Sequence, residues 1–355
     1  MPRSAETVAE DFSYFLEHDR IAALVKSLKE TAYRMTDVDA RFLVDAYYQV
    51  QEARKAADNQ FRSLTGGPVQ LIEWLCGNLA SLEAKIKTLL KWYADGRVPG
   101  VWSQSIVGIG PVIAAGLSAH IDIARAQTVG HIWRFAGLDP TRQWKSTEAV
   151  TKELSALGIK GTLDDETFAR ACSAFGCDVG ATQAFLDHAP KGPKTRTASN
   201  VAKAFSRRPW NADLKVLCWK IGQSFVKVCN HEEDIYGHLY QQRKAYEVAK
   251  NEAGDYADQA AATLEKVPAH AQRAIYKTGQ LPPGRIDQRA QRWATKLFLA
   301  HWHHVAYETQ YGTPPPKPYV IEHMGHVNLM GPPNWPFPED KADFPYGTRA
   351  RRLPE

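Results

Sequence analysis

The sequence predicts an all-α protein, and three observations support that fold class. Apolar residues recur at alternating steps of three and four over 72–93, which keeps one face of a helix apolar. Helical patterns also run through 210–228, 236–250 and 287–311. At most one or two short stretches show the alternation that is typical of strands. Helices are therefore expected to build nearly the whole fold.

Residues 1–95 are expected to form a bundle of three helices, the last of them a coiled-coil seam. The first carries apolar residues four and three apart, at Ile21, Val25, Leu28, Ala32 and Met35. A capping box of Thr36 and Asp39 opens the second, which ends near Leu64 before Thr65-Gly66-Gly67-Pro68. The seam consists of Ile72, Leu75, Leu79, Leu82, Ile86, Leu89 and Tyr93. It either packs within the bundle or joins two copies, and we expect a homodimer.

Residues 96–146 are predicted to form a helix-hairpin-helix domain, after a loop at 95–100. Within the run SIVGIGPVIAAGL, a Gly-apolar-Gly turn joins two helices, and Pro111 takes the first position of the second. Free backbone N–H groups at such a turn suit a phosphate oxygen, and glycine lets it come close. The predicted DNA-backbone contacts are Gly108, Ile109 and Gly110. In the alternative interpretation the glycines serve packing alone.

Residues 147–208 are predicted to be a helical insertion that ends in a basic run. Thr162-Leu163-Asp164-Asp165 supplies a helix start within it. Over 191–208 the chain has six basic residues and no acidic one, namely Lys191, Lys194, Arg196, Lys203, Arg207 and Arg208. These residues are predicted to contact phosphates, and a solvated cationic surface is the alternative.

Residues 209–312 are predicted to be further helices, and 313–355 a proline-rich tail that cannot be regular helix. The last long helix and the tail carry five histidines, namely His301, His303, His304, His323 and His326. Their spacing admits a zinc site. Aromatic neighbours favour packing with hydrogen bonds to the tail instead, so neither a metal nor a cofactor is predicted.

Composition limits the class of protein. The chain has 355 residues, a net charge of +5, 44% hydrophobic residues and 10% aromatic residues, which together exclude a disordered, collagenous or rod-like chain. The longest apolar stretch, 107–119, is too short to cross a bilayer, and the first residues do not read as a secretory signal. Five cysteines without a CxxC pair indicate buried thiols. We therefore expect a cytoplasmic protein without a membrane partner.

The run from Ile106 to Pro140, which contains GIGP and, about 25 residues later, AGLDP, resembles the transposase_20-type domain of the IS-one-ten family of insertion-sequence transposases. A weaker resemblance resumes at 210–217. Full members of that family have a RuvC-like nuclease half with an acidic metal-binding tetrad, and act with a guide RNA. Here residues 1–95 show heptads and none of the alternating strands that would present those acids. The resemblance therefore implies a phage- or plasmid-borne variant without the nuclease half.

The resemblance also implies a serine that becomes joined to DNA shortly after the AGLDP element, and Ser146 is the serine in that place. As an alternative, Ser146 is the N-cap of a helix that starts at Thr147. The expected function is that of a DNA-binding, transposase-like protein of mobile-element or phage origin, with serine-dependent strand transfer as its chemistry. A non-catalytic recombination-accessory or architectural protein and a coiled-coil interaction or virion-associated protein are the alternatives. The partner is DNA or a structured RNA.

Overall fold

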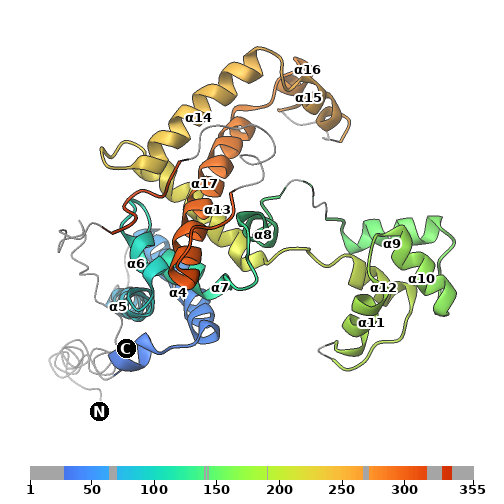
Figure 1. The fold of residues 1–355 in the computed structure, drawn as a ribbon, viewed down its shortest axis with the longest axis horizontal. Helices are drawn as coiled ribbons and strands as arrows, with labels where there is room; N and C mark the ends of the chain where they lie inside the picture. Colours follow the sequence, from blue (N-terminus) through green and yellow to red (C-terminus); the bar gives the residue numbers. More distant parts are fainter. Residues whose placement is uncertain are drawn as a thin grey trace. The chain divides into compact units, whose positions relative to one another are not determined.

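The computed structural model describes residues 28–63, 70–139, 141, 144–189, 191–266, 272–317 and 330–337. Over these ranges the chain is helical and forms no strand, apart from an isolated bridge between Thr162 and Thr197 (Figure 1). The prediction of an all-α fold is confirmed. No helix within the described ranges has the length and apolar character that crossing a membrane requires.

The helices run in the following order. They are α3 (Lys29–Tyr33), α4 (Asp37–Ser63), α5 (Gln70–Asp95), α6 (Val98–Gln104), α7 (Pro111–His120), α8 (Val129–Phe135), α9 (Thr147–Ala156), α10 (Asp165–Ala174), α11 (Val179–Asp187), α12 (Ala198–Phe205), α13 (Ala212–Val228), α14 (Ile235–Glu252), α15 (Ala257–Leu264), α16 (Arg273–Lys277) and α17 (Pro283–Tyr311). The sequence pattern did not indicate α15 and α16.

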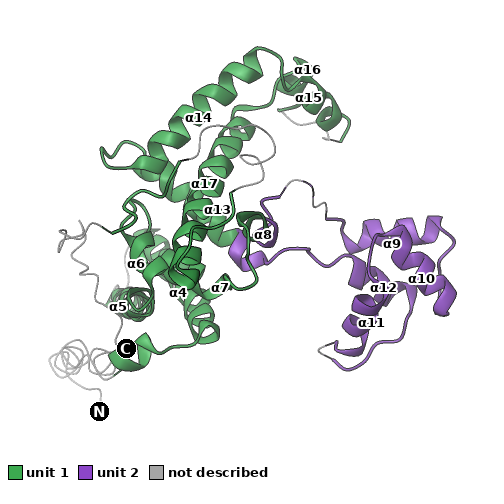
Figure 2. Ribbon diagram, in the orientation of Figure 1, with its two compact units in different colours: residues 1–133, 216–355 green, residues 134–215 purple. Residues whose placement is uncertain are grey.

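The chain divides into two compact units (Figure 2). Unit 1 consists of Met1–Trp133 and Val216–Glu355, and unit 2 of Arg134–Lys215. The predicted insertion, 147–208, falls inside unit 2. Each unit buries its own apolar cluster, so each has the kind of core that a domain needs.

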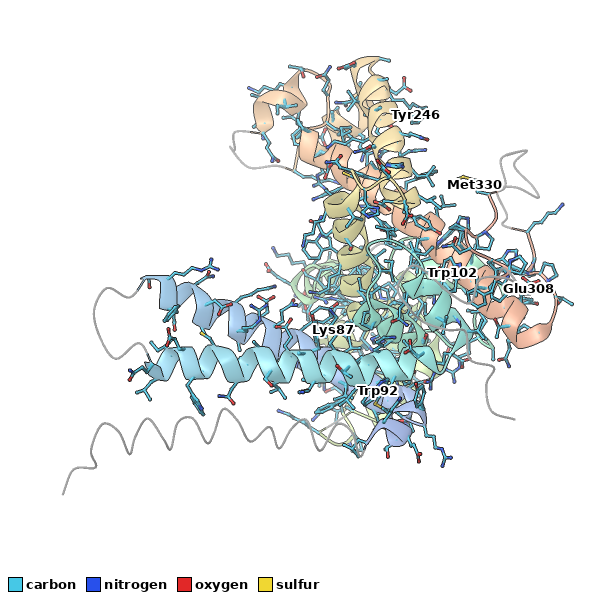
Figure 3. The ribbon with its side chains drawn as sticks, turned by 90° about the vertical axis from the view of Figure 1, so that its left-hand side faces the viewer. Lys87, Trp92, Trp102, Tyr246, Glu308 and Met330 are labelled. Atoms are coloured by element: carbon cyan, nitrogen blue, oxygen red, sulfur yellow. The ribbon has the colours of Figure 1, made fainter. Side chains whose placement is uncertain are left out.

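In unit 1, α4 and α5 lie side by side and run in opposite directions (Figure 3). The Tyr93 hydroxyl donates to Asp37 at 2.6 Å, and Arg54 pairs with Glu83 at 2.6 Å. The predicted capping box is confirmed, because the Asp39 N–H donates to Thr36 Oγ1 and the Thr36 N–H donates to Asp39 Oδ2, each at 3.2 Å. The predicted first helix is described only from α3 onward, and the predicted TGGP stop lies outside the described residues.

The predicted seam of α5 is buried only at its C-terminal end. Ile86 and Tyr93 join a core with residues of α4 and α7, and Leu90 is fully buried there in place of the predicted Leu89, which is half-buried. Leu75 and Leu82 remain 43% and 37% exposed. Among the residues that the structure describes, the half of the seam near residue 70 is therefore only partly covered.

The predicted loop at 95–100 is wrong in its extent, since Gly96 and Arg97 alone separate α5 from α6. Pro99 lies in the first turn of α6, where a missing N–H costs no helical hydrogen bond. A Cβ atom on Gly100 would lie 2.3 Å from the carbonyl oxygen of Ala94. Glycine at this position therefore allows α6 to fold back directly on α5.

Unit 2 packs α9 to α12 around a core that includes Val150, Leu154, Phe168, Ala171 and Val201. Its helices begin at side-chain caps, as their sequence predicts. The cap residues are Ser146, Asp164, Asp178 and Thr197. Each cap side chain accepts from the backbone N–H three residues later, so the starts of these helices are determined locally.

The remainder of unit 1 is built on α14 and α17, which pack along each other. Glu247, 1% exposed, accepts from Arg243 at 2.6 Å and from Arg289 at 2.7 Å. Burial alone would raise the pKa of its carboxyl, but hydrogen bonds from the Tyr256 hydroxyl, Arg289 and Arg243 hold that pKa below the ordinary value. The predicted helix start at Asp287 is four residues late, because Pro283 occupies the first turn of α17, a position that proline tolerates.

The described part of the tail, 330–337, is not helical and is fastened to α6 and α17 (Figure 3). The Trp102 indole N–H donates to the carbonyl of Pro333 at 2.7 Å. Asn334 Nδ2 donates to the carbonyl of Ser105 at 3.2 Å, and the Trp335 indole donates to Glu308 at 2.8 Å. The tail thus supports the back of the segment that leads into the predicted hairpin.

Candidate nucleic-acid interface

The predicted hairpin is present in unit 1 as the turn between α6 and α7. The turn is closed by a hydrogen bond from the Ile109 N–H to the carbonyl of Ile106 at 3.0 Å. Ile106 and Ile109 are 4% and 5% exposed, so both anchor the turn in the core. Pro111 is the first residue of α7, as predicted. Ile109 therefore presents its backbone, and not its side chain, to any ligand at the turn.

Gly108 has a packing role. Its φ is +88°, a region that residues with a Cβ rarely adopt. Ser224 Oγ donates to the Gly108 carbonyl at 2.5 Å, and an added Cβ would lie 2.9 Å from Val228 Cγ2. At this position the alternative interpretation, glycine for packing, is supported, because the turn rests directly on α13.

Gly110 has no comparable packing role. It is exposed, its φ of −89° suits any L-residue, and an added Cβ would meet no heavy atom within 4 Å. It is the N-cap of α7 and has no side chain to accept the first N–H groups of the helix. The backbone N–H groups of Val112 and Ile113 lie in the first turn of α7 and have no acceptor within the helix. An anion can therefore approach them over the bare Cα of Gly110.

Positive charge beside the hairpin comes from α13. Lys227 is exposed one turn beyond Ser224, the residue that contacts Gly108. Lys220 is half-buried, with Nζ 3.7 Å from the centre of the Tyr48 ring. Burial lowers the pKa of Lys220, and the charges of Lys55 and Lys227 add to that effect, while Glu52 opposes it. An anionic ligand beside Lys220 would favour its charged form.

Two apolar side chains extend the same face of α13. Trp219 is 61% exposed and Val216 is 52% exposed. We call Val216, Trp219, Lys220 and Lys227 the α13 face. The last three lie three, four and eleven residues after Val216, a spacing that places all four on one side of the helix. Sequence reasoning missed this face, although its helical spacing of exposed aromatic and basic residues was visible in the pattern.

The basic run lies in unit 2, so the predicted contact residues fall into different units. Five of its six bases are exposed, namely Lys191, Lys194, Lys203, Arg207 and Arg208. Arg196 is engaged within the unit: it pairs with Asp165, bonds to Gln183 and lies over Phe168, 4.6 Å from the ring centre. The five exposed bases are available for phosphates, whereas Arg196 fastens α12 to α10 and α11.

Ser146 is the N-cap of α9, the alternative that the sequence offered. Its Oγ accepts from the Ala149 N–H at 3.2 Å. Lys145, the cation beside it, is paired with Glu153 at 2.6 Å. A serine nucleophile needs a base that removes its proton. The structure describes the chain around Ser146 from Trp144 onward, and there its Oγ contact accounts for a cap and includes no such base.

The histidines of α17 are held by neighbours of their own. His301 Nδ1 lies 2.6 Å from the Tyr236 hydroxyl and its Nε2 lies 2.9 Å from the Met330 carbonyl. His303 Nε2 lies 2.7 Å from the Ala126 carbonyl, and His304 faces Glu308 at 3.3 Å. His323 and His326 lie outside the described residues. Within the described ranges no three His, Cys, Asp or Glu side chains gather as metal ligands would.

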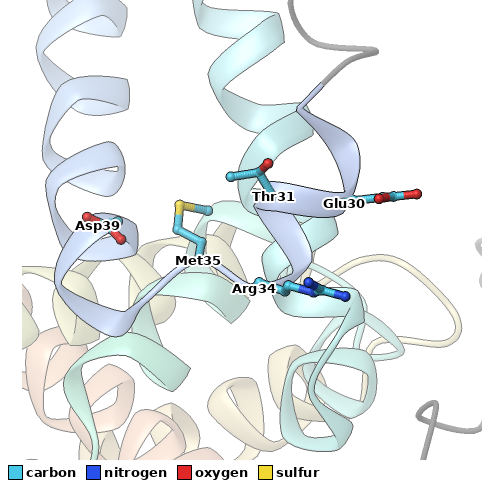
Figure 4. A pocket seen from close by; sticks show the side chains of 5 residues that line it. All are labelled: Glu30, Thr31, Arg34, Met35 and Asp39. Carbon is cyan, nitrogen blue, oxygen red and sulfur yellow. The ribbon is translucent and has the colours of Figure 1, made fainter.

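A hollow beside α3 is lined by Glu30, Thr31, Arg34, Met35 and Asp39 (Figure 4). Figure 4 shows Glu30 pointing away from Met35 and Asp39. The Asp39 carboxylate is already bonded to Thr36 in the capping box. The hollow therefore offers little convergent chemistry to a small molecule.

No family model matches the chain, and searches of curated proteins and of solved structures likewise find no match.

Proposed function

We propose that this protein binds the phosphate backbone of DNA through the hairpin between α6 and α7, with the α13 face beside it. The observation that carries the proposal is Gly110, an exposed glycine at a helix N-terminus that neither its backbone angles nor its neighbours require. A phosphate oxygen at this point would meet the first N–H groups of α7 and the positive end of the helix. Such contacts carry no sequence information, so binding is independent of base sequence.

The lysines supply the long-range attraction that backbone N–H groups lack. Lys227 and Lys220 lie on α13, the helix whose Ser224 contacts the turn. Each phosphate that a cation neutralises steepens the fall of log affinity with log salt by about 0.9. Exposed Trp219 adds an apolar contact with a sugar or base. The hairpin and the α13 face together would form the DNA-binding site of a cytoplasmic, transposase-like protein of a mobile element or phage.

Fluorescence anisotropy over a salt series tests the proposal, with labelled linear, branched and hairpin DNA and a hairpin RNA. Gly110→Asp places a carboxylate where the phosphate would sit, and we expect affinity for DNA to fall about tenfold or more. Aspartate is among the best N-cap residues, so this variant should keep α7 intact. Lys227→Glu should weaken binding and reduce the salt slope.

The matched control is Lys87→Glu, the same charge change on the exposed face of α5 (Figure 3). It should bind as the wild type does. If Gly110→Asp binds DNA with unchanged affinity, or if the wild type binds none of the four ligands, the hairpin is not a phosphate site. Preference for the hairpin RNA over every DNA would keep the site and change the partner.

A non-catalytic, recombination-accessory role is the second candidate, and the cap geometry of Ser146 favours it over strand transfer. Ser146→Asp distinguishes the two, because aspartate caps a helix as well as serine but cannot form a serine–DNA bond. We expect DNA binding and thermal stability to be unchanged in this variant. A covalent protein–DNA product that the wild type forms and Ser146→Asp does not would instead establish the strand-transfer role.

A further inference from the structure

Unit 2 carries an aromatic surface that its own core does not use. Trp144 precedes α9 and is 44% exposed. Its indole N–H donates to the Ser206 carbonyl at 2.8 Å, so the ring is held in place while much of it faces solvent. A flat ring held in this way loses little conformational freedom when a ligand stacks on it.

One cation of the basic run, Arg208, lies over this ring, and Arg207 next to it lies over a second aromatic ring. The Arg208 guanidinium carbon is 5.6 Å from the Trp144 ring centre, and that of Arg207 is 4.5 Å from the ring centre of Phe185. Lys203 lies in the last turn of α12 and is exposed. Two further exposed cations, Arg207 and Arg208, follow the end of this helix. We call Trp144, Lys203, Arg207 and Arg208 the Trp144 platform.

The nearest acidic side chains of α9 already have partners. Glu153 is paired with Lys145 at 2.6 Å, and Glu148 with Lys152 at 3.2 Å. The run that supplies the platform has six bases and no acid over 191–208. The platform is therefore suited to a polyanion and unsuited to a protein surface of mixed charge.

We propose that the Trp144 platform binds single-stranded nucleic acid, with a base stacked on Trp144 and the flanking phosphates at Lys203, Arg207 and Arg208. A stack of this kind needs an unpaired base, since the faces of bases in a duplex are covered by their neighbours. Stacking on an aromatic side chain with basic residues along the backbone is how proteins hold single strands without reading their sequence. This inference rests on the proposed function only in that both bring a nucleic acid to the protein.

The test uses the full chain and measures anisotropy with labelled oligothymidine and oligouridine of about 20 nucleotides, beside a duplex of the same length. Alanine substitution of a stacking aromatic residue costs on the order of 5- to 150-fold in affinity. We expect Trp144→Ala to weaken single-strand binding within that range and to leave duplex binding unchanged. Trp144→Phe, which keeps an aromatic ring, should retain most of the affinity.

The matched control is Tyr246→Ala, because Tyr246 is 51% exposed, belongs to α14 of unit 1 and has the Arg243 guanidinium carbon 4.8 Å from its ring centre. It should bind single strands as the wild type does. Light-induced crosslinking of oligonucleotides that carry 5-bromouracil provides a second measurement, which does not depend on the folding of any variant. The adduct should map to Trp144.

The measurements distinguish failure of the Trp144 platform from failure of the hairpin. Equal single-strand affinity of Trp144→Ala and the wild type, an adduct that maps elsewhere, or a wild type that binds no single strand would overturn the platform. Duplex binding that Gly110→Asp abolishes would still support the hairpin in all three cases. Conversely, single-strand binding that needs Trp144, together with a wild type that does not bind duplex or branched DNA, would retain the platform and reject the hairpin.

Discussion

Gly108 and Gly110 differ in what the fold requires of them. Gly108 combines a φ of +88° with direct contact to Val228 and Ser224, whereas Gly110 has ordinary angles and open space around it. We expect Gly108→Ala to lower the free energy of unfolding by about 2 kcal/mol, through left-handed strain and overpacking. Gly110→Ala should cost less than about 1 kcal/mol. Urea unfolding of both variants checks this, and equal losses would contradict the assignment of packing to Gly108 alone.

His301 makes stability depend on pH. Burial lowers its pKa from 6.5 to about 4, because the imidazolium would lose its hydration between Tyr236 and Met330. The unfolded chain binds the proton more readily, so the stabilisation is complete above about pH 6.5 and is lost as the pH falls through 4. It amounts to about 3 kcal/mol. His303 adds to it in the same direction.

His301→Gln tests this pH dependence, since glutamine can keep a hydrogen bond but does not titrate in this range. Melting temperatures measured from pH 7 to pH 4 should fall less steeply for the variant than for the wild type. Parallel curves would mean that other groups carry the acid sensitivity. The pH dependence concerns the core of unit 1 and not the hairpin.

Single residues could be predicted from the sequence where their partners are close along the chain. The capping box of Thr36 and Asp39 and the cap at Ser146 depend on groups three residues away. The role of Gly108 depends on Ser224, which is 116 residues away, and no local pattern contains that partner. The glycines of one motif therefore looked alike in the sequence and differ in the fold.

At the scale of elements, α5 shows how far periodicity leads. The steps of three and four predicted a helix from 72 to 93, and α5 runs from Gln70 to Asp95. Periodicity predicts an apolar seam but does not show which residues pack on it. Among the described residues, the core shared with α4 and α7 includes only the C-terminal end of the seam. The start of α6 was missed because a proline and a glycine were taken to mean a loop, whereas Pro99 and Gly100 fit the first turn of a helix packed on α5.

The N-terminal half of α5, whose apolar side chains are partly exposed, is where we expect two copies to meet. Leu71, Trp74, Leu75 and Leu82 are all more than a third exposed and follow a helical spacing. Leu75→Glu with Leu82→Glu should shift the protein from dimer to monomer in sedimentation at micromolar concentration, because charges at a seam oppose association. Glu73→Gln, on the same turn of the helix, is the control and should sediment as the wild type does. A wild type that is already monomeric would contradict the predicted dimer.

At the scale of the whole molecule, the two compact units have separate cores and should unfold separately. Phe168 is 1% exposed in the core of unit 2. Phe168→Ala should destabilise that unit by about 3–5 kcal/mol. In differential scanning calorimetry, one transition should move to lower temperature while the transition of unit 1 remains in place. A single transition that shifts as a whole would show that the units unfold together.

The sequence also predicted that residues 147–208 interrupt the hairpin domain, and this stretch lies within unit 2. It did not separate the candidate contact residues by unit, since a list of basic residues and glycines carries no spatial information. The sequence also did not predict the α13 face. Lys220 and Lys227 lie beside the hairpin only because Ser224 and Val228 of the same helix pack against the turn. Long-range packing decides which charges accompany the hairpin.

The hydrogen bond between Trp102 and Pro333 has a consequence for folding during translation. These residues are 231 positions apart, so the ribosome releases α6 long before the acceptor of the Trp102 indole exists. Until then the indole N–H of Trp102 lacks the acceptor that it has in the complete chain. A nascent chain that stalls before residue 330 thus has the hairpin without its support. Cellular proteases would encounter such a chain as an unstable product, and translation must pass Pro333 before α6 has this contact.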